Sequence, residues 1–218
     1  MKTKGFIFDL DGVIVDTAKY HFLAWKKLAN QLGIDFTEHE NEQLKGVSRV
    51  RSLEKILSWG NKTISQTQFS ELMEAKNNDY LQYISAMDTQ EILPDVPRVL
   101  NTLKGLEQSI ALGSASKNAR AILERVNLKH HFNAIVDGND VSKAKPDPEV
   151  FIIAAKLLNV NPEDCVVFED SVAGVKAANA ANMVSIGIGN SAILGHAKHV
   201  FNDFTEISNA FIDSLISK

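Results

Sequence analysis

Residues Gly5–Gly12 read GFIFDLDG, and this stretch indicates what kind of fold the chain adopts. A short apolar run leads directly into Asp9, which is typical of a buried strand that ends at a polar edge. Asp11 and Gly12 then end the strand, because Asp-Gly is a strong turn signal. Taken alone, an Asp-x-Asp-Gly pattern is usually a surface turn, so its meaning depends on the residues at the ends of the other strands.

After Pro94 the chain alternates between helical segments and short apolar strands. Apolar residues at helical spacing precede each strand, and a last helix is expected near residues 207–215. The strands expected after the first one are residues 109–113, 134–136, 165–168 and 184–188. Because short strands alternate with helices, we predict an α/β fold with a Rossmann-like parallel sheet as its core.

The segment from Asp16 to Met87 differs from the rest because helical spacing continues through all of it. Gly33 is suited to end a first helix, and Ser48 is suited to cap the start of a second. The helices expected in this segment lie around residues 22–32, 50–57 and 69–87.

This helical block is predicted to be a separate all-helical domain that is inserted after the first strand. The predicted domains are residues 16–89 for the helical insertion, and residues 1–15 together with 90–218 for the α/β core. Its two connections, near residues 13–17 and 87–94, would act as hinges.

The composition excludes several classes of partner. The chain has 218 residues, with 23 lysines and arginines against 27 acidic residues, and this net charge of −4 disfavours nucleic-acid binding. The longest apolar run, Val150–Ala155, is far shorter than the roughly 20 residues of a membrane span. No signal peptide is visible, and Cys165 is the only cysteine. We therefore expect a soluble, cytoplasmic protein without a membrane or nucleic-acid partner.

Polar residues follow the predicted strands at the points where the strands end. Carboxyl ends of parallel strands meet at one edge of a sheet, which is where ligands bind. The residues expected there are Asp9, Asp11, Ser114, Lys145, Glu169 and Asp170. Clustered carboxylates repel one another unless a cation lies between them, and Mg²⁺ suits such oxygen ligands together with a phosphate. The pattern therefore predicts a phosphoryl-transfer site.

The two aspartates of the first motif permit a division of labour. Asp9 could attack phosphorus and carry an aspartyl-phosphate, while Asp11 could act as general acid and base. Lys145 and Mg²⁺ would neutralise charge on the transferring group, and Ser114 would hold its oxygens. Lys143 is a second candidate for the lysine, but the Lys-Pro-x-Pro context favours Lys145.

Four motifs are similar to those of the haloacid dehalogenase superfamily of phosphotransferases. They are Phe8–Val13, the Ser114 loop, Lys145–Pro148 and Glu169–Ser171. The helical insertion stands where this superfamily carries a mobile helical cap. The resemblance implies Asp9 as nucleophile, Asp11 as acid and base, and a Mg²⁺ site. The implied metal ligands are Asp9, Asp11 through its backbone carbonyl, Glu169 and Asp170.

Nearly the whole chain also resembles one branch of that superfamily, the β-phosphoglucomutases. The stretches that carry this resemblance are Asp16–Phe22, Ala24-Trp25, Asn41–Arg49 and Ser114–Asn118. The resemblance implies conversion of β-D-glucose 1-phosphate to glucose 6-phosphate, with β-glucose 1,6-bisphosphate as intermediate and priming phosphate donor. It also implies that His21 assists Asp11 and that Thr17 lies near the hinge.

The same resemblance implies a set of substrate-binding residues, part of which would hold a second phosphate. These are Trp25, Gly46, Val47, Ser48, Arg49, Ser52, Lys76, Ser114, Ala115, Ser116, Lys117, Asn118 and Lys145. Several have plain alternatives: a lone Arg49 is often a solvated surface residue, and Lys76, on an apolar helix face, could simply snorkel. Trp25 could pack inside the cap or stack on a sugar.

Two other functions fit the motifs. A sugar-phosphate phosphatase would share the metal, the nucleophile and the core site, and would differ in letting water attack the aspartyl-phosphate. A non-catalytic binding protein would be expected to lack the nucleophile or the metal carboxylates, all of which are present. We expect a small sugar phosphate as the partner and a monomer as the working form, while the exact sugar stays open.

Overall fold

A computed structural model describes residues 3–217, and its centre is a six-stranded sheet. All neighbouring strands pair in parallel, in the order β3-β2-β1-β4-β5-β6. The strands are β1 Gly5–Phe8, β2 Ser109–Gly113, β3 Ala134–Val136, β4 Cys165–Glu169, β5 Val184–Ile188 and β6 His199–Phe201. The predicted parallel α/β sheet is confirmed, and β6 extends it by one strand beyond those predicted.

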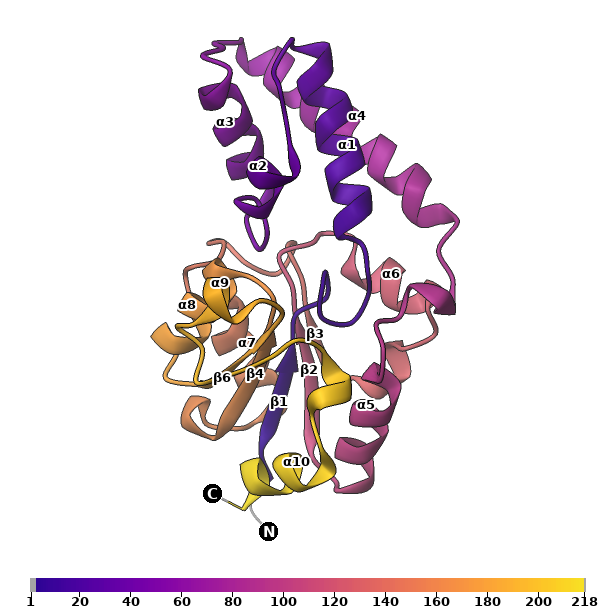
Figure 1. The fold of residues 1–218 in the computed structure, drawn as a ribbon, viewed down its shortest axis with the longest axis vertical. Helices are drawn as coiled ribbons and strands as arrows, with labels where there is room; N and C mark the ends of the chain where they lie inside the picture. The colour runs from indigo at the N-terminus through magenta and orange to yellow at the C-terminus, as the bar shows by residue number, and fades with distance from the viewer. Residues whose placement is uncertain (1–2, 218) are drawn as a thin grey trace.

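Helices cover both faces of the sheet, as the alternation of side chains along β1 requires (Figure 1). Phe6 and Phe8 point into one apolar cluster, and Ile7 points into the other. The first cluster packs against α5 Val96–Gly105, α6 Ala119–Arg125 and α10 Asn209–Ile216. The second packs against α7 Glu149–Leu158 and α8 Val172–Ala180. Both faces are therefore buried, as expected for a parallel sheet.

The inserted helices stand beyond the carboxyl ends of the strands (Figure 1). They are α1 Ala18–Gln31, α2 Glu38–Glu42, α3 Arg49–Trp59 and α4 Gln66–Ser85. We call residues 16–89 the helical cap. It has an apolar cluster of its own, which includes Trp25, Phe36 and Leu53. The division at residues 16 and 89 remains our proposal.

Sequence reasoning missed the short helix α2. Its start is a capping box, in which the Thr37 hydroxyl accepts from the His39 amide and the Glu40 carboxylate accepts from the Thr37 amide. This signal is readable as Thr-x-x-Glu, but α2 buries none of its residues. Without an apolar stripe, periodicity could not find it.

Helix α4 connects the cap with the sheet. Phe69 and Met73, in its first half, pack against the cap cluster, whereas Tyr80 and Ile84, further along, belong to the apolar cluster on the sheet. The two parts of the chain therefore share one helix as well as two connections.

The two connections run side by side. The Asp16 amide donates to the Glu91 carbonyl at 2.9 Å, and the Leu93 amide donates to the Ile14 carbonyl at 3.0 Å. The Tyr20 hydroxyl also donates to the Glu91 carboxylate at 2.6 Å. Because the connections are bonded to each other, they would move as one unit if the cap rotates.

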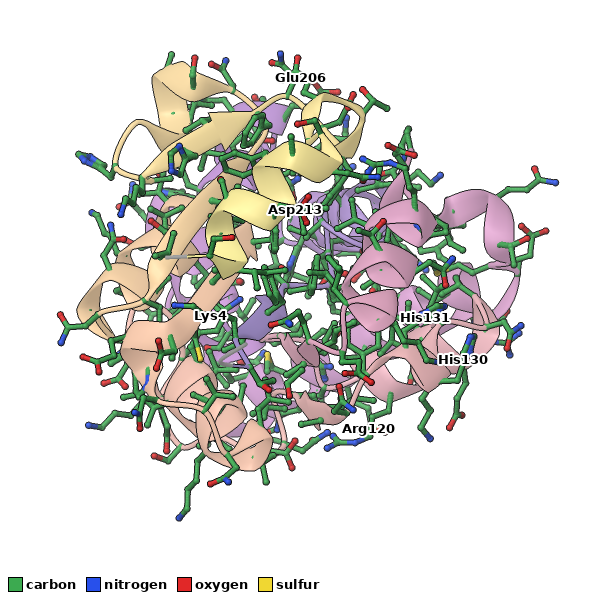
Figure 2. The ribbon with its side chains drawn as sticks, turned by 90° about the horizontal axis from the view of Figure 1, so that it is seen from below. Lys4, Arg120, His130, His131, Glu206 and Asp213 are labelled. Carbon is green, nitrogen blue, oxygen red and sulfur yellow. The ribbon has the colours of Figure 1, made fainter. Side chains whose placement is uncertain are left out.

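The opposite end of the sheet carries α10 and the start of β1 (Figure 2). There the Lys4 ammonium lies 3.1 Å from the Asp164 carboxylate. The remaining elements are short: α9 Ser191–Leu194 and the 3-10 helices Thr89–Glu91, Lys129–His131, Pro162–Asp164 and Phe204–Glu206. No helix within residues 3–217 is both long and apolar enough to cross a membrane.

The sheet core beneath the first motif gives a test of stability. Phe8 is fully buried and stacks on Phe168 with ring centroids 4.6 Å apart. We expect Phe8→Ala to lower the free energy of unfolding by about 3–5 kcal/mol, since it leaves a cavity directly before Asp9. Urea denaturation would measure the loss. Leu157→Ala, at a position that is 59% exposed, is the matched control and should cost less than about 1 kcal/mol.

Candidate active site

Three carboxylates meet where β1 and β4 end. The register pairs Phe8 with Phe168, and the Asp9 amide donates to the Phe168 carbonyl at 3.0 Å, so Asp9 lies beside Glu169. Carboxylate oxygens of Asp9, Glu169 and Asp170 lie within 4.8 Å of one another. Neighbouring parallel strands thus place residues that are 160 positions apart in one cluster.

Lys145 joins this cluster from the loop before α7. Its ammonium donates to Asp9 Oδ1 at 2.7 Å and to the Gly113 carbonyl at 3.1 Å, and it also contacts the Glu169 carboxylate. Burial acts to lower the pKa of Lys145, but the carboxylates of Asp9 and Glu169 outweigh burial and hold the pKa above its usual value. Lys143 is exposed, with its ammonium 3.6 Å from Asp147, so the choice of Lys145 agrees with the geometry.

The three carboxylates fit a magnesium ion. Burial is the largest cause that raises the pKa of Asp9, to about 7, and the nearby Lys145 opposes it. Burial and the neighbouring Glu169 also raise the pKa of Asp170 well above its usual value. Two lysines, Lys145 and Lys45, do not balance three carboxylates, and hard oxygen ligands are those that Mg²⁺ prefers.

Two glycines permit the carboxylates to come this close. A Cβ on Gly174 would overlap the carboxylate of Glu169, and a Cβ on Gly12 would overlap that of Asp170. Gly12 also has φ of +78°, which a side chain would strain. The first turn of α8 and the turn after β1 are therefore shaped around the cluster.

Asp11 points away from the cluster, toward the cap. The Thr17 hydroxyl donates to its carboxylate, and His21 Nε2 lies 3.8 Å from the same oxygen. Burial raises the pKa of Asp11, and the bond from Thr17 lowers it. The Asp11 carboxylate is thus separate from the three grouped carboxylates. This separation is what the expected role needs, in which the carboxylate transfers protons and only the backbone carbonyl binds metal.

His21 is linked to Lys76 of α4. Their Nδ1 and Nζ atoms lie 2.9 Å apart. Burial, and next the charge of Lys76, hold the pKa of His21 well below its usual value, so the ring is neutral at pH 7. A protonated Lys76 donates to Nδ1, which leaves the ring proton on Nε2, toward Asp11. A polar chain therefore runs from the cap to Asp11.

Lys76 is buried between aromatic rings and does not snorkel to solvent. Only 2% of the residue is exposed. Its ammonium lies 4.6 Å from the centroid of Trp25 and 4.8 Å from that of Tyr80. Burial lowers the pKa of Lys76 to about 7, with Arg49 as the second cause. Trp25 thus packs in the cap cluster with the lysine on its face, and it also lines the cavity, so its contact with a sugar stays a prediction.

Tyr80 was missed as a site residue. Sequence reasoning placed it in an apolar stripe, and its ring does stack on His21 at 4.2 Å. A tyrosine four residues after a buried lysine is the signal that could have shown it, because the two lie on one helix face.

The loop after β2 is built as a series of turns. Ser114 is fully buried, its amide donates to the Val136 carbonyl at 3.0 Å, and its hydroxyl accepts from the Ser116 amide at 3.0 Å. The Ser116 hydroxyl then accepts from the Asn118 amide at 3.3 Å. This arrangement turns the loop toward the cap just before α6.

The cap and the core together enclose a cavity of about 1600 Å³. Most of the predicted site residues line it. They are Asp9, Asp11, His21, Trp25, Gly46, Val47, Ser48, Arg49, Lys76, Ser114, Ala115, Ser116, Lys117, Asn118, Lys145 and Asp170. Thr17 and Glu169 lie behind the wall, where they contact Asp11 and Lys145.

Ser52 is the predicted substrate-binding residue that does not line this cavity. It is buried in α3, with only 2% exposed, and its amide donates to the Ser48 carbonyl at 2.9 Å. Ser52 lies on the buried side of α3 together with Leu53 and Ile56, and its contact with a ligand stays a prediction.

The cap touches the core around this cavity. The Lys45 ammonium lies 3.6 Å from the Asp170 carboxylate, and the Asn118 side-chain amide donates to that of Asn77 at 3.3 Å. A Cβ on Gly46 would overlap the hydroxyl of Ser171. Close approach of the cap loop to the core therefore depends on a glycine at position 46.

Comparison with known proteins agrees with this arrangement. The family model for haloacid dehalogenase-like hydrolases matches residues 3–182. The chain belongs to this haloacid dehalogenase-like family.

Individual relatives of this haloacid dehalogenase-like protein include mutases and phosphatases. A β-phosphoglucomutase of Bacillus subtilis is 47% identical over 188 residues, which are 85% of this chain and 83% of that protein. A crystal structure of β-phosphoglucomutase from Clostridium difficile has a TM-score of 0.95 and 41% identity, covering 99% of this chain and 98% of that chain. A fructose-1-phosphate phosphatase of Escherichia coli is 30% identical over 184 residues, which are 84% of this chain and 95% of that protein.

The glycine beneath Glu169 gives a test of the metal site. We expect Gly174→Ala to raise the Mg²⁺ concentration needed for half-maximal activity by about 10- to 100-fold, because the added methyl group displaces the Glu169 carboxylate. Titration of activity with Mg²⁺ measures this shift. Gly105→Ala, where a Cβ meets no atom within 4 Å, is the control and should leave the titration unchanged. Equal titrations of the two variants would contradict our assignment of the site.

Proposed function

We propose that this chain is a Mg²⁺-dependent phosphomutase that interconverts β-D-glucose 1-phosphate and glucose 6-phosphate. One observation carries the proposal: a single cavity has two groups of anion-binding residues. In the first group, Lys145 donates to Asp9 and Ser114 follows β2, the strand next to β1; Arg49 and Ser116 make up the second group. A substrate that accepts a phosphate at one end while it carries a phosphate at the other end needs both groups of residues. The 47% identity to a β-phosphoglucomutase supports this reaction.

In the proposed cycle, Asp9 carries the phosphate between sugar oxygens. The 6-hydroxyl oxygen of β-glucose 1-phosphate attacks the phosphorus of phospho-Asp9, and the bond from phosphorus to Asp9 breaks. Asp11 takes the proton of this hydroxyl. The product, β-glucose 1,6-bisphosphate, turns round so that its 1-phosphate faces Asp9. Asp9 attacks this phosphorus, Asp11 returns the proton to the leaving oxygen, and glucose 6-phosphate is released.

The proposal assigns the metal to Asp9, Glu169 and Asp170, with the backbone carbonyl of Asp11 as a further ligand. When bound, the ion supplies positive charge to the oxygens of the transferring group. The Lys145 ammonium, which already lies 2.7 Å from Asp9, supplies further charge at the same place. Ser114 would hold an oxygen of the same group.

Asp11 suits proton transfer because its carboxyl lines the cavity and accepts a hydrogen bond from Thr17. Burial raises the pKa of its carboxyl, which favours a proton donor near neutral pH. Thr17 and the neutral His21 hold the carboxyl in place from the cap side. Because these contacts come from the cap, we propose that Asp11 is in position only when the cap is closed over the core. Closure would also exclude water from phospho-Asp9.

A sugar-phosphate phosphatase is the competing function, since one relative is a fructose-1-phosphate phosphatase. The decisive experiment is a coupled assay with the α and β anomers of glucose 1-phosphate, with Mg²⁺ and a trace of bisphosphate. We expect glucose 6-phosphate from the β anomer only. Stoichiometric release of inorganic phosphate without glucose 6-phosphate would show a phosphatase instead. The expected monomeric state and cytoplasmic location remain predictions.

The nucleophile has a direct test. Asp9→Asn should lower turnover by at least about 10⁴-fold, because an amide neither attacks phosphorus nor carries the phosphate. The far-ultraviolet spectrum should be unchanged, because the amide keeps the size of the carboxylate. Mass spectrometry after exposure to bisphosphate should show a phosphorylated wild type and no phosphorylated variant. Turnover within tenfold of wild type would contradict covalent catalysis at Asp9.

Arg49 tests the second anion site. Arg49→Ala should raise the KM for β-glucose 1-phosphate about 10- to 100-fold, since it removes charge-assisted hydrogen bonds to the distal phosphate. Hydrolysis of a small phosphate ester with one phosphate serves as the control reaction and should change less than twofold. Equal losses with the two substrates would place Arg49 outside a distal site.

A further inference from the structure

The lining of the cavity is more cationic than the rest of the chain. Nine of the 23 lysines and arginines line this one cavity, against five of the 27 acidic residues. The chain as a whole carries a net charge of −4. The positive charge is therefore concentrated at one opening of an otherwise acidic protein.

Part of this charge belongs to the site already described. Lys45, Arg49, Lys76 and Lys145 are buried or half-buried among the cap loop, the aromatic rings and the carboxylates. The other five cationic residues of the lining are exposed and have no part in the proposed chemistry, apart from the expected contact of Lys117. They are Arg51, Lys55, Lys117, Lys143 and Lys176. We call these five residues the cationic rim.

The rim comes from both sides of the mouth. Arg51 and Lys55 are on α3 of the cap, whereas Lys143 and Lys176 belong to the core, in the loop before α7 and on α8. A ligand that enters between cap and core therefore passes positive charge on both sides.

Most of the rim charge on the core side is not neutralised. Within the described residues 3–217, neither Lys117 nor Lys176 makes an ion pair, and Lys143 has only a 3.6 Å contact with Asp147. On the cap side, Arg51 pairs with Glu54 at 2.8 Å, and Lys55 donates to a backbone carbonyl. The core side is thus the stronger source of positive potential.

We propose that the cationic rim is a capture surface for doubly phosphorylated sugars, which draws β-glucose 1,6-bisphosphate into the cavity before any specific contact forms. This inference rests on the proposed function. A cleft lined with charge of one sign raises the association rate of an oppositely charged ligand by roughly 10- to 1000-fold. The bisphosphate benefits more than either monophosphate because it carries both phosphates. Each turnover also requires this intermediate to leave Asp9 and return reversed.

The shape of the surface favours a small anion over a nucleic acid. The five rim residues surround a concave opening, while acidic residues outnumber basic ones over the chain as a whole. A duplex needs a basic face along many phosphates, and the net charge of −4 would repel it. A sugar bisphosphate fits inside a cavity of about 1600 Å³.

The test removes two rim charges and compares the result with the loss of two charges elsewhere. The rim variant is Lys143→Gln with Lys176→Gln, and the control is Lys156→Gln with Lys198→Gln. Lys156 and Lys198 are also exposed but do not line the cavity, so the net charge of the two variants is equal. Stopped-flow tryptophan fluorescence, recorded without Mg²⁺ so that no phosphate is transferred, reports the association of β-glucose 1,6-bisphosphate, and Trp25 lines the cavity.

At low ionic strength we expect the association rate of the rim variant to fall about 5- to 10-fold, with the dissociation rate nearly unchanged. The control variant should change less than twofold. In 1 M salt, where the screening length is about 3 Å, the rim variant should match wild type. Equal losses in both variants, or a loss that persists in 1 M salt, would overturn the proposal. Lys176→Gln alone serves if the double rim variant fails to fold.

This experiment separates the rim from the proposed function. A wild type that binds bisphosphate with strong salt dependence but forms no glucose 6-phosphate would refute the mutase and leave the capture surface intact. A wild type that turns over normally, with association rates that do not respond to salt, would refute the capture surface and leave the mutase intact.

Discussion

The site depends on one buried ammonium. Lys145 lies between the carboxylates of Asp9 and Glu169 and also bonds the Gly113 carbonyl, so it ties together the ends of β1, β2 and β4. Breaking a buried pair of this kind costs about 3–5 kcal/mol, because the remaining charge loses its partner. The lysine still leaves negative charge uncompensated once Asp170 is counted. This excess of negative charge gives the cluster an affinity for a cation.

The cap supplies side chains around the Asp11 carboxylate. Asp11 belongs to the turn after β1, but Thr17, His21 and Lys76, which surround its carboxylate side, belong to the cap. The backbones of the two connections are hydrogen-bonded to each other, so we expect them to move together if the cap rotates. Position of the acid and base is therefore coupled to the position of the cap, whereas the nucleophile stays on the rigid sheet.

Sequence alone predicted the sheet and its polar edge well. The spacing of apolar residues indicates the strands, and the polar residues directly follow these strands along the chain. Asp9, Lys145 and Glu169 follow strands, and parallel strands bring their ends together regardless of separation in the chain. The cap was harder. Ser52 was expected at the ligand and is buried, whereas Tyr80, expected in the apolar core and found there, also stacks on His21. Which face of a cap helix meets the ligand depends on how the helices pack against one another, and the apolar spacing along one helix does not give that packing.

The distribution of charge connects the fold with the proposed reaction. A phosphatase needs one anion site and a water molecule that attacks the phospho-aspartate. A mutase needs a second anion site and must exclude water from the phospho-aspartate. Arg49 of the cap and Ser116 of the core both line the cavity, so a ligand with two phosphates can contact both parts at once. In the proposed mechanism such a ligand would stabilise a closed arrangement by contacts with both the cap and the core, which a monophosphate in the proximal site alone would not make. Closure would then be favoured by the sugar phosphate that accepts the phosphate, whereas a water molecule makes no contacts that favour closure.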